Sequence, residues 1–592
     1  MVDATAERLL ARLSPAQRAA VTSDAPLLCV MAGAGSGKTT VLTRRVAFRI
    51  LAGAADAEHT LVVTFTRKAA AELGARLARL GIGTGVWAAT FHSAAYSVLR
   101  RHWLDQGRTP PAVVNDPLPI LRRLIDEEPG GDRSMAVPLA EELSWCRACL
   151  VRPDRYPEMA TAARRTPPLP LEQVVSLMGR YEQEKRRRRV IDLDDLIPAC
   201  AELVEGGGAA AEAICWRLRH LFVDEFQDVN PAQWRLLEAW RRGRPELFVV
   251  GDPRQAIYAW NGSDPALLHR LPTLVPGTVV VHLDHNHRSS PSIVSAARSV
   301  LPPARGAQDR ASSFSDAGPD GPPPQLRGFD DKDAEAEAVV RWLRTTRRPE
   351  QPWRQLAVLA RTNARLAQVH QELVRCGIPV RRAGSSDERA ASAVLRMLRS
   401  VDRAMPLRGA LVDVLAELEA KAANGEPSPP PSSAGDSSGR SSPDAGLAGR
   451  LQELADEHAQ HEPRATVGSF LAFLAANRAE GDLGGQAADG VELATFHQAK
   501  GLEWPAVALV GLEVGTMPIS YAAGDDALAE ERRLLYVAFT RAASRLWCSW
   551  VSRPSPFLEP VRASLAEQVP LEPAAARRMV GDLHRRLAAV AG

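Results

Sequence analysis

A glycine-rich loop near the N-terminus carries the clearest chemistry in the sequence. The apolar run Leu27 to Val30 suits a buried strand, and a helical pattern begins after the loop. Between them stand Ala32, Gly33, Ala34, Gly35, Ser36, Gly37, Lys38 and Thr39. In this context backbone N–H groups and a helix N-terminus surround phosphate oxygens, while the lysine adds a cation and the hydroxyl a Mg²⁺ ligand. Ala32 replaces the first glycine of the general pattern, where a small residue suffices. The loop predicts a nucleoside triphosphate site.

A second segment, which ends in two acidic residues, completes a hydrolytic site. The apolar run His220 to Val223 ends in Asp224 and Glu225. We expect Asp224 to join Thr39 around magnesium and Glu225 to polarise the attacking water. Lys38 and Asp224 lie 186 residues apart, whereas two or three strand–helix units of about 30 residues would connect such strands. Roughly a hundred residues must therefore be an insertion, and residues 101–195 have a mostly helical pattern.

The composition is that of an ordinary globular protein. The chain has 592 residues, 45% of them hydrophobic, and 73 basic against 70 acidic residues give a net charge of +3. A nearly neutral charge neither requires nor excludes nucleic acid. The seven scattered cysteines fit a reducing compartment, and Cys146 with Cys149 is the only CxxC pair, which by itself is weak evidence for a metal. No run of 18 apolar residues and no signal peptide occur, so we expect a cytoplasmic protein without membrane contact.

The elements that must hold these residues follow an alternating pattern. Short apolar runs such as LLCVMAG, TLVVTF, ELFVVGD and LAVLART alternate with longer helical stretches. This alternation predicts an α/β fold with parallel sheets. Residues 302–324 and 424–446 are rich in Pro, Gly, Ser and Asp, which predicts flexible linkers, and disorder for 424–446.

Further segments, in fixed order, resemble the UvrD/Rep/PcrA group of superfamily 1 DNA helicases over about residues 10–550. They are LSPAQ ending at Gln17, TFTRKAA from Thr64, ATFH from Ala89, VDEFQD from Val223, VGDPRQAIYAW from Val250, HNHRS from His285, TFHQAKGLE from Thr495 and YVAFTRA from Tyr536. TFHSAAYSVLRRHW and VIDLDDLI are most similar to the second UvrD-like helicases of actinobacteria, although the C-terminal HRDC module and tetracysteine segment of that branch are not visible. The resemblance implies two RecA-like P-loop lobes, each with a helical insertion, the second one reduced.

The resemblance also implies roles in ATP binding and hydrolysis. Gln17 would read adenine, His287 would stack on it, and Glu503 would contact the sugar. Arg288 and Arg541 would act on the γ-phosphoryl group, where an arginine contributes about 10³ to 10⁵ in rate. Gln255 would couple the γ-phosphate to the strand-binding side, and ATP would sit between the two lobes. The implied cofactors are ATP and Mg²⁺.

Six residues match the single-strand channel of the group. Stacking on aromatic side chains holds bases at about 1–3 kcal/mol each without demanding sequence. The resemblance assigns stacking to Phe65, Tyr258 and Trp260 and polar contacts with the backbone to Thr90, His92 and His497. The arginine run 186–189 could touch duplex phosphates, but a solvated face is the more common role of such a run.

The implied division of the chain follows the motifs. The first lobe covers residues 1–100 and 196–275, with the insertion 101–195; the second covers 276–400 and 487–560, with the reduced insertion 401–486; a tail covers 561–592. Three residues depart from the group's pattern: Thr40 after the P-loop threonine, and His287 and Asn261. Because the second insertion is small, we expect good translocation but weak unwinding by the protein alone.

The leading prediction is an ATP-dependent three-prime to five-prime DNA helicase or translocase that acts on single-stranded DNA and on junctions with duplex, in DNA repair or recombination. We expect a monomer or weak dimer, with a repair protein as partner and an association with the nucleoid. Two alternatives remain open at this stage. One is a translocase that strips proteins from DNA with little unwinding, and the other is an ATP-gated DNA-binding scaffold. An RNA helicase fits the TFTRKAA and YVAFTRA segments less well.

Overall fold

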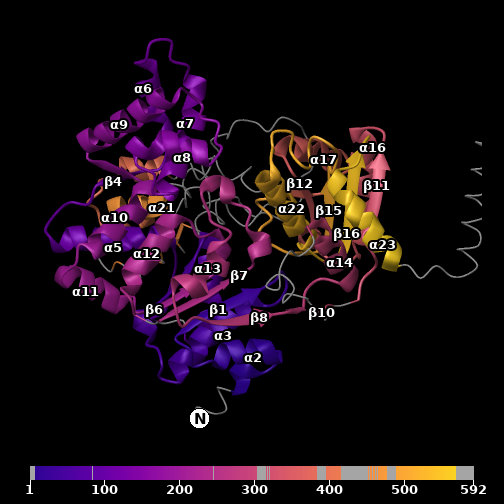
Figure 1. Ribbon diagram of the computed structural model, residues 1–592, viewed down its shortest axis with the longest axis horizontal. Helices are drawn as coiled ribbons and strands as arrows, with labels where there is room; N and C mark the ends of the chain where they lie inside the picture. Colours follow the sequence, from indigo (N-terminus) through magenta and orange to yellow (C-terminus); the bar gives the residue numbers. More distant parts are fainter. Residues whose placement is uncertain are drawn as a thin grey trace, which may run out of the picture. The chain divides into compact units, whose positions relative to one another are not determined.

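The computed structural model describes residues 7–568 except 83–84, 245, 303–314, 317, 319, 383–394, 415–450, 453, 457, 460–461, 463–464 and 477–488. Contacts between residues divide the chain into two units (Figure 1). The first comprises Met1–Gly33, Gly37–Asp284 and Arg382–Ala488, and the second comprises Ala34–Ser36, His285–Arg381 and Asp489–Gly592. The linker expected at 424–446 lies outside the described residues.

The first unit is built on a parallel sheet of six strands. Their order is β3-β2-β6-β7-β1-β8. The strands are β1 (Leu27–Ala32), β2 (Thr60–Thr64), β3 (Trp87–Thr90), β6 (His220–Val223), β7 (Leu247–Gly251) and β8 (Val279–Leu283). The inner strands β2, β6 and β7 are buried along their whole length, as continuous apolar runs in a parallel sheet require. The carboxyl ends of these strands carry the P-loop and the acidic pair.

Helices cover both faces of this sheet. Alternate side chains of β1 belong to two apolar clusters, with Cys29 in one and Leu28 and Val30 in the other. The helices are α2 (Pro15–Thr22), α3 (Lys38–Leu51), α4 (Arg67–Arg79), α5 (Phe91–Asp105), α10 (Leu193–Glu205), α11 (Gly208–Arg217), α12 (Pro231–Arg241) and α13 (Leu267–Leu274). The result is a doubly covered α/β sheet.

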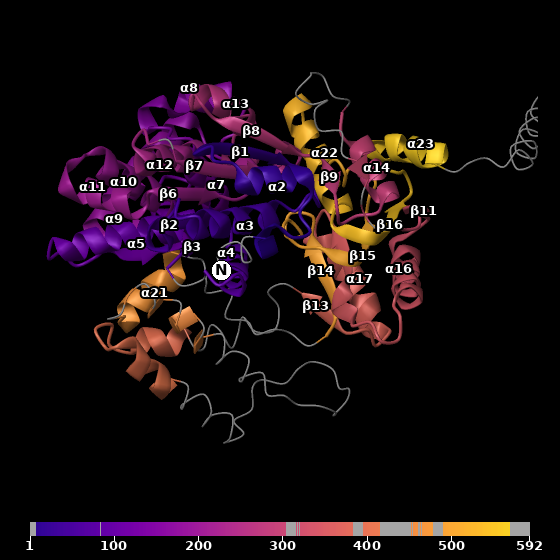
Figure 2. The ribbon, with the colours of Figure 1, turned by 90° about the horizontal axis from the view of Figure 1, so that it is seen from below.

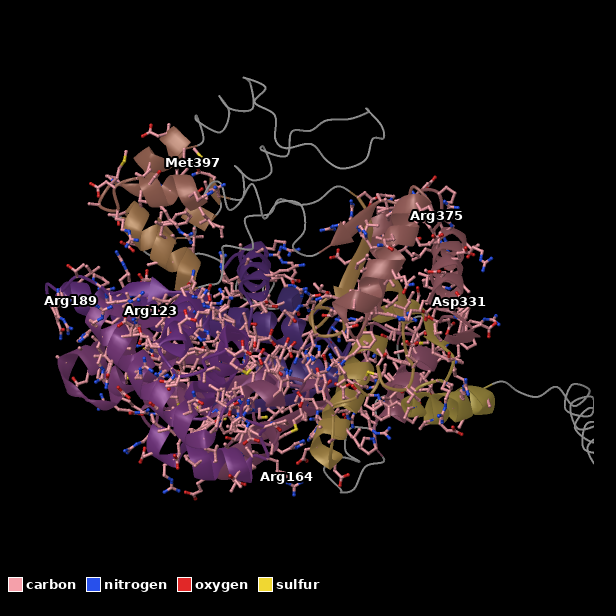
Figure 3. The ribbon with its side chains drawn as sticks, turned by 90° about the horizontal axis from the view of Figure 1, so that it is seen from above. Arg123, Arg164, Arg189, Asp331, Arg375 and Met397 are labelled. Carbon is pink, nitrogen blue, oxygen red and sulfur yellow. The ribbon has the colours of Figure 1, made fainter. Side chains whose placement is uncertain are left out.

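Residues 101–195 contain the predicted helices. They are α6 (Leu118–Asp126), α7 (Ala136–Ala148), α8 (Tyr156–Ala162) and α9 (Leu171–Arg188), which lie together in Figure 1 and share one apolar cluster. The short strands β4 (Ala112–Val114) and β5 (Val190–Asp192) pair in parallel where the chain leaves and re-enters this group. Arg187 and Arg188 at the end of α9 bind Glu184, and Arg189 lies at the outer edge of the unit (Figure 3).

The second unit has its own six-stranded sheet, in the order β11-β16-β15-β12-β14-β13. The strands are β11 (Gln325–Phe329), β12 (Leu356–Ala360), β13 (Val380–Arg382), β14 (Val491–Thr495), β15 (Trp504–Val510) and β16 (Ala542–Val551). The helices are α14 (Pro291–Val300), α16 (Lys332–Thr346), α17 (Asn363–Arg375), α22 (Asp525–Phe539) and α23 (Glu559–Gln568). The short strands β9 (His285–Asn286) and β10 (Ser315–Asp316) pair beside them.

The second insertion packs on the first unit, although in sequence it interrupts the second. Its described residues, 395–414 and parts of 451–476, form a separate apolar cluster. Helix α21 (Val467–Ala476) contacts α5 and β4. Helices α21 and α5 lie side by side in Figure 2. Arg100 of α5 forms an ion pair with Glu462, and the Arg67 guanidinium lies 5.5 Å from the centre of the Phe473 ring.

The α/β prediction with parallel sheets is confirmed. Two boundaries differ. β8, which the motif order assigned to the second lobe, pairs with β1, so the first sheet extends to Leu283. Valines in its sequence, VVVHL, are equally compatible with either sheet. Leu395 and Leu398, assigned to the second lobe, belong to the apolar cluster of the second insertion. No helix within the described ranges is both long and apolar enough to cross a bilayer.

Candidate functional site

Two glycines of the P-loop sit where only glycine fits. Gly35 and Gly37 have φ angles of +72° and +83°, in the left-handed region. A Cβ atom on Gly37 would lie 2.7 Å from the Gln17 Nε2 atom, so the side chain of Gln17 rests directly against the loop. The Gln17 Oε1 atom accepts a hydrogen bond from the Ser14 backbone N–H at 3.0 Å and forms the capping box of α2. Helix capping therefore fixes Gln17 beside the loop.

The hydrolytic residues meet at the carboxyl ends of β1 and β6. Lys38 begins α3, and its Nζ atom lies 3.4 Å from the Glu225 Oε2 atom. Asp224 is buried, and burial together with the neighbouring Glu225 raises the pKa of its carboxyl to about 7. Glu225 has φ +51°, an unusual conformation for a glutamate, which turns its side chain towards Lys38. The predicted triad of lysine and two acids is thus assembled in the first unit.

These residues suit a magnesium ion that is bound mostly through a nucleotide. Among the described residues no group of three or more His, Cys, Asp or Glu could hold a metal alone. Mg²⁺ commonly binds one or two carboxylates together with substrate phosphates and water. A nearby dication would stabilise the ionised form of Asp224, which burial disfavours. Thr39 follows Lys38 in the first turn of α3.

A buried glutamine connects Glu225 to the next motif. Gln227 is fully buried, and its Nε2 atom donates to the Glu225 Oε2 atom at 2.6 Å. Its Oε1 atom accepts from the backbone N–H of Asp252 at 2.9 Å. The Asp252 Oδ2 atom accepts from the Gln255 Nε2 atom at 2.6 Å, and Gln255 is also buried. A continuous hydrogen-bonded chain therefore runs from Glu225 to Gln255.

In the second unit, Asn286 holds the segment that contains His287 and Arg288. Asn286 is buried, and its Nδ2 atom donates to the Ala34 carbonyl at 3.0 Å. Its Oδ1 atom accepts from the backbone N–H groups of Arg288 at 2.8 Å and Ser289 at 2.9 Å. The His287 N–H also donates to the Gly35 carbonyl. These contacts explain why Ala34–Ser36 group with the second unit.

The other predicted nucleotide residues of the second unit are engaged with protein groups. Arg288 forms an ion pair with Glu503, the residue assigned to the sugar. Arg541 follows α22 and is buried, and its guanidinium donates to the carbonyls of Val537 and Leu502 at 3.0 Å each. Burial and the neighbouring His285 lower the pKa of His287, which favours its neutral ring. Neutral imidazole suits stacking on a base.

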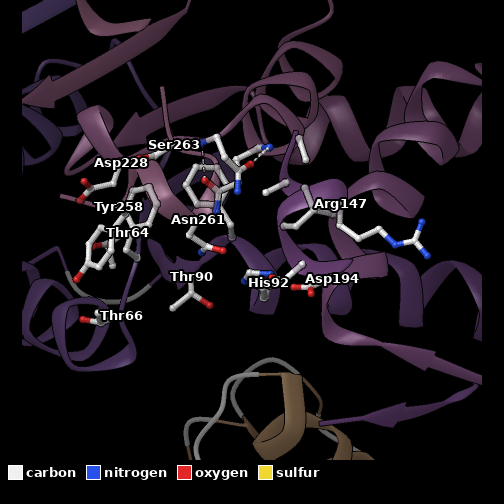
Figure 4. A pocket seen from close by; sticks show the side chains of 18 of the residues that line it. Thr64, Thr66, Thr90, His92, Arg147, Asp194, Asp228, Tyr258, Asn261 and Ser263 are labelled. Atoms are coloured by element: carbon white, nitrogen blue, oxygen red, sulfur yellow. Dashed lines mark hydrogen bonds between the residues drawn. The ribbon is translucent and has the colours of Figure 1, made fainter. Parts of the chain in front are cut away.

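A pocket of about 410 Å³ in the first unit gathers most of the predicted DNA residues (Figure 4). Phe65, Thr90, His92 and Tyr258 line it, together with Asn261. Phe65 packs edge-to-face on Phe91, with ring centres 5.6 Å apart, which fixes its orientation. The Thr90 Oγ1 atom accepts from the Ser93 N–H and caps α5. Aromatic and hydroxyl groups predominate over charge, as expected for a strand-stacking site.

Two predicted DNA residues lie outside this pocket lining. Trp260 is 55% exposed, and its ring centre lies 6.5 Å from that of Tyr258, so it extends the aromatic surface towards solvent. His497 belongs to the second unit, after β14. Burial and the nearby Arg361 and Lys500 lower the pKa of His497 to about 4. His497 is therefore neutral at pH 7 and can offer a hydrogen bond to a phosphate only as a neutral donor.

Several residues of the site were not predicted from the sequence. The pocket is also lined by Ser144, Arg147, Asp194, Asp228 and Ser263. Arg147 pairs with Asp195 at 3.3 Å and with Glu182, and in Figure 4 its guanidinium points away from Tyr258. Gln227 lies in the VDEFQD motif and Asp252 in the VGDPRQAIYAW motif, and this position in a motif is the signal that could have identified them. Nothing in the spacing distinguished their linking role, because it depends on how the loops after β6 and β7 meet.

Comparison with known proteins is consistent with this geometry. Residues 13–275 match the UvrD/REP helicase N-terminal domain, and residues 281–387 and 445–553 match the UvrD-like helicase C-terminal domain. The ATP-dependent DNA helicase UvrD2 of Mycobacterium tuberculosis is 36% identical over 572 residues, covering 93% of this chain and 80% of that protein. DNA helicase II of Escherichia coli is 27% identical, with 96% and 90% covered.

The fold and the two sites thus define a P-loop ATPase of the helicase type. The chain belongs to the UvrD/REP family of ATP-dependent DNA helicases. The ATP-dependent DNA helicase UvrD1 of Mycobacterium leprae is a further relative, 30% identical with 94% of this chain and 85% of that protein covered. The predicted family is confirmed, and the enzyme is a DNA-dependent ATPase.

Proposed function

We propose that this helicase moves along single-stranded DNA in the three-prime to five-prime direction, using one hydrogen-bonded relay to link ATP hydrolysis to its strand-binding pocket. The observation that carries the proposal is the chain Glu225, Gln227, Asp252 and Gln255. Gln255 stands three residues before Tyr258, which lines the pocket. A change in the charge on Glu225 can therefore reach the DNA side through four adjacent groups of one unit.

The ATP site acts through positioning and electrostatic stabilisation. Lys38 and the N–H groups of Ala32–Thr39 bind the phosphates, Gln17 contacts adenine, and Glu225 orients the attacking water. Thr39 and Asp224 would hold Mg²⁺, which would neutralise charge on the phosphate oxygens. Arg288 and Arg541 stabilise the charge that develops on the γ-phosphoryl group. Arg288 exchanges its present partner Glu503 for that charge, and Glu503 then contacts the sugar.

The strand is held by Phe65, Tyr258 and Trp260 through stacking, and by Thr90, His92 and His497 through backbone contacts. The substitution of Thr40, His287 and Asn261 for the group's usual residues leaves the hydrolytic residues intact. Asn261 lines the pocket, where it offers an amide in place of a cation. We place the function in DNA repair or recombination, at junctions between single strand and duplex, with a repair protein as partner.

A second candidate function, protein stripping with little unwinding, is supported by the second insertion. Its described part packs on α5 and holds Arg100 through Glu462. An insertion docked on the first unit leaves less surface for gripping duplex. Separating each base-pair step costs about 1.4 kcal/mol on average, so weak grip on the junction lowers unwinding before it lowers translocation.

The two candidates are distinguished on one DNA that carries a three-prime tail, a duplex and a biotin–streptavidin block. Strand separation and streptavidin displacement are measured in parallel, with enzyme below substrate. Displacement without separation supports the stripping translocase, and separation at a comparable rate supports the helicase. Equal activity on a five-prime tail would contradict the proposed direction.

A further inference from the structure

A groove of about 760 Å³ runs along the edge of the first sheet and shares no lining residue with the pocket described above. One wall is β3, the outermost strand, which pairs with β2 and with no other described strand, together with α5. The opposite wall comes from the second insertion through His458, Glu462, Thr466 and Phe473. None of the lining residues has a role in ATP or DNA binding in the proposed function.

The edge of β3 offers backbone groups to this groove. In a strand, successive residues direct their N–H and C=O groups to alternate sides. The N–H of Thr90 turns away from β2, because it donates to the Ser93 Oγ atom at 3.1 Å. Ala88, two residues earlier, therefore also turns its N–H and C=O away from β2, into the groove that it lines. Outside the sheet, no residue in the described part of the chain hydrogen-bonds to Ala88.

The groove also carries an excess of positive charge. Arg100 is neutralised by Glu462, whereas Arg101 has its nearest carboxylate, Asp105, at 3.9 Å. Arg217 lies over the Trp87 ring at 5.6 Å and has no carboxylate within 4 Å among the described residues. Burial and the nearby Arg101 lower the pKa of Arg217. A carboxylate placed in the groove would relieve the repulsion between these two guanidinium groups.

Apolar side chains surround these cations. Leu104 lines the groove and is 47% exposed. Phe473 and Tyr96 line it from the two walls. Aromatic and arginine side chains are enriched at the energetic centres of protein interfaces. An exposed Leu104 in a charged groove is therefore typical of a surface that a partner covers.

We propose that this groove binds an extended segment of a partner protein, in which an acidic side chain is flanked by apolar ones. The segment pairs its backbone with Ala88, as peptides do when they add a strand to a sheet edge. Its carboxylate lies between Arg101 and Arg217, and its apolar side chains contact Leu104 and Phe473. Peptide is favoured over nucleic acid because the free groups of Ala88 match a peptide backbone, and because Arg217 already covers the Trp87 ring on which a base would stack.

The test uses the full chain and a library of random nine-residue peptides displayed on phage. The most enriched peptide is synthesised with a fluorescent label, and its Kd is measured by anisotropy. We expect the enriched peptides to contain acidic residues flanked by apolar ones. The labelled peptide should bind both Arg217→Glu and Ala88→Pro at least tenfold more weakly than wild type. Proline is tolerated on edge strands, so the second change removes the free N–H with little effect on the sheet. Arg108→Glu, an exposed arginine after α5 that does not line the groove, is the matched control and should bind as wild type.

DNA-stimulated ATP hydrolysis should be unchanged in all three variants, which also shows that they fold. The proposal is overturned if no enriched peptide depends on Arg217, or if Arg217→Glu weakens binding of a fifteen-residue oligo(dT) tenfold and leaves the peptide unaffected, which would make the groove a nucleic-acid surface. Concentration-dependent self-association that Arg217→Glu abolishes, seen by sedimentation, would identify a second copy of the chain as the occupant and also overturn it.

Discussion

The Gln227 Nε2 atom donates a 2.6 Å hydrogen bond to the Glu225 Oε2 atom, and both residues stand in one turn after β6. Since the same amide accepts from the Asp252 N–H, the orientation of Glu225 is tied to the loop after β7. A fully buried amide has no water to replace either partner, so breaking this link costs about 1–3 kcal/mol. In the proposed function, this relationship lets Glu225 respond to occupancy of the pocket that holds the strand.

Replacing Gln227 should uncouple hydrolysis from DNA. In Gln227→Leu both hydrogen bonds are lost at nearly constant volume, and we expect stimulation of ATP hydrolysis by single-stranded DNA to fall about tenfold or more, in line with the loss of one to two buried hydrogen bonds. The KM for ATP should change little, because Gln227 is not assigned to the nucleotide. Steady-state kinetics with and without oligo(dT) measures both. A uniform loss of activity with a lowered Tm would indicate a merely structural role.

Removing the anchor of the motif that contains His287 should weaken nucleotide binding. Asn286→Ala deletes the donor to the Ala34 carbonyl and the acceptor of two backbone N–H groups. We expect the KM for ATP to rise about tenfold, because a buried hydrogen-bond network is lost. Ser299→Ala, in helix α14 of the second unit, is a suitable control. An unchanged KM in Asn286→Ala would show that this anchor does not order the nucleotide site.

Trp260 provides a test of strand stacking that leaves the core untouched. Because Trp260 is 55% exposed, the Tm of Trp260→Ala should equal that of wild type within experimental error. Loss of one stacked base costs about 1–3 kcal/mol, so the Kd for oligo(dT) should rise about 5- to 150-fold. Fluorescence anisotropy measures the change, with the equally exposed Trp216→Ala as control. Equal affinity in wild type and Trp260→Ala would remove Trp260 from the DNA path.

The half-buried His497 should make stability depend on pH. Its pKa is lowered to about 4, first by burial and then by Arg361 and Lys500. Between pH 6.5 and pH 4 the unfolded state therefore binds a proton that the folded state does not, and stability falls as the pH falls through this range. In His497→Gln the unfolded state no longer binds this proton. The Tm of the variant should therefore rise relative to that of wild type as the pH falls from 7 to 5. A difference in Tm that is constant with pH would contradict the assignment.

Much of both sites could be predicted from the sequence, because the residues stand in short segments at strand ends. The approach of Lys38 to Glu225 follows from a loop after β1 and an acidic pair after β6, since parallel strands end at one edge of a sheet. Phe65, Thr90 and Tyr258 meet for the same reason. Local sequence therefore determines these groupings once the sheet is parallel.

Other features depend on long-range packing that no short segment encodes. The link through Gln227 requires the loops after β6 and β7 to touch, and the anchor at Asn286 requires its segment to reach Ala34. The docking of the second insertion through Glu462 and Phe473 was not predicted either, because the mostly apolar sequence of α21 does not say which surface it covers. The groove beside β3 follows from that docking.

The central claim, that Glu225 drives hydrolysis in a DNA-stimulated motor, is tested most directly by the rate of ATP hydrolysis with and without single-stranded DNA. Wild type should hydrolyse ATP faster when oligo(dT) is added. Glu225→Gln should lose at least about a hundredfold of the stimulated rate, as expected for loss of a positioned general base, and should still bind oligo(dT). Turnover by Glu225→Gln equal to that of wild type, or a wild-type rate that oligo(dT) leaves unchanged, would contradict the account.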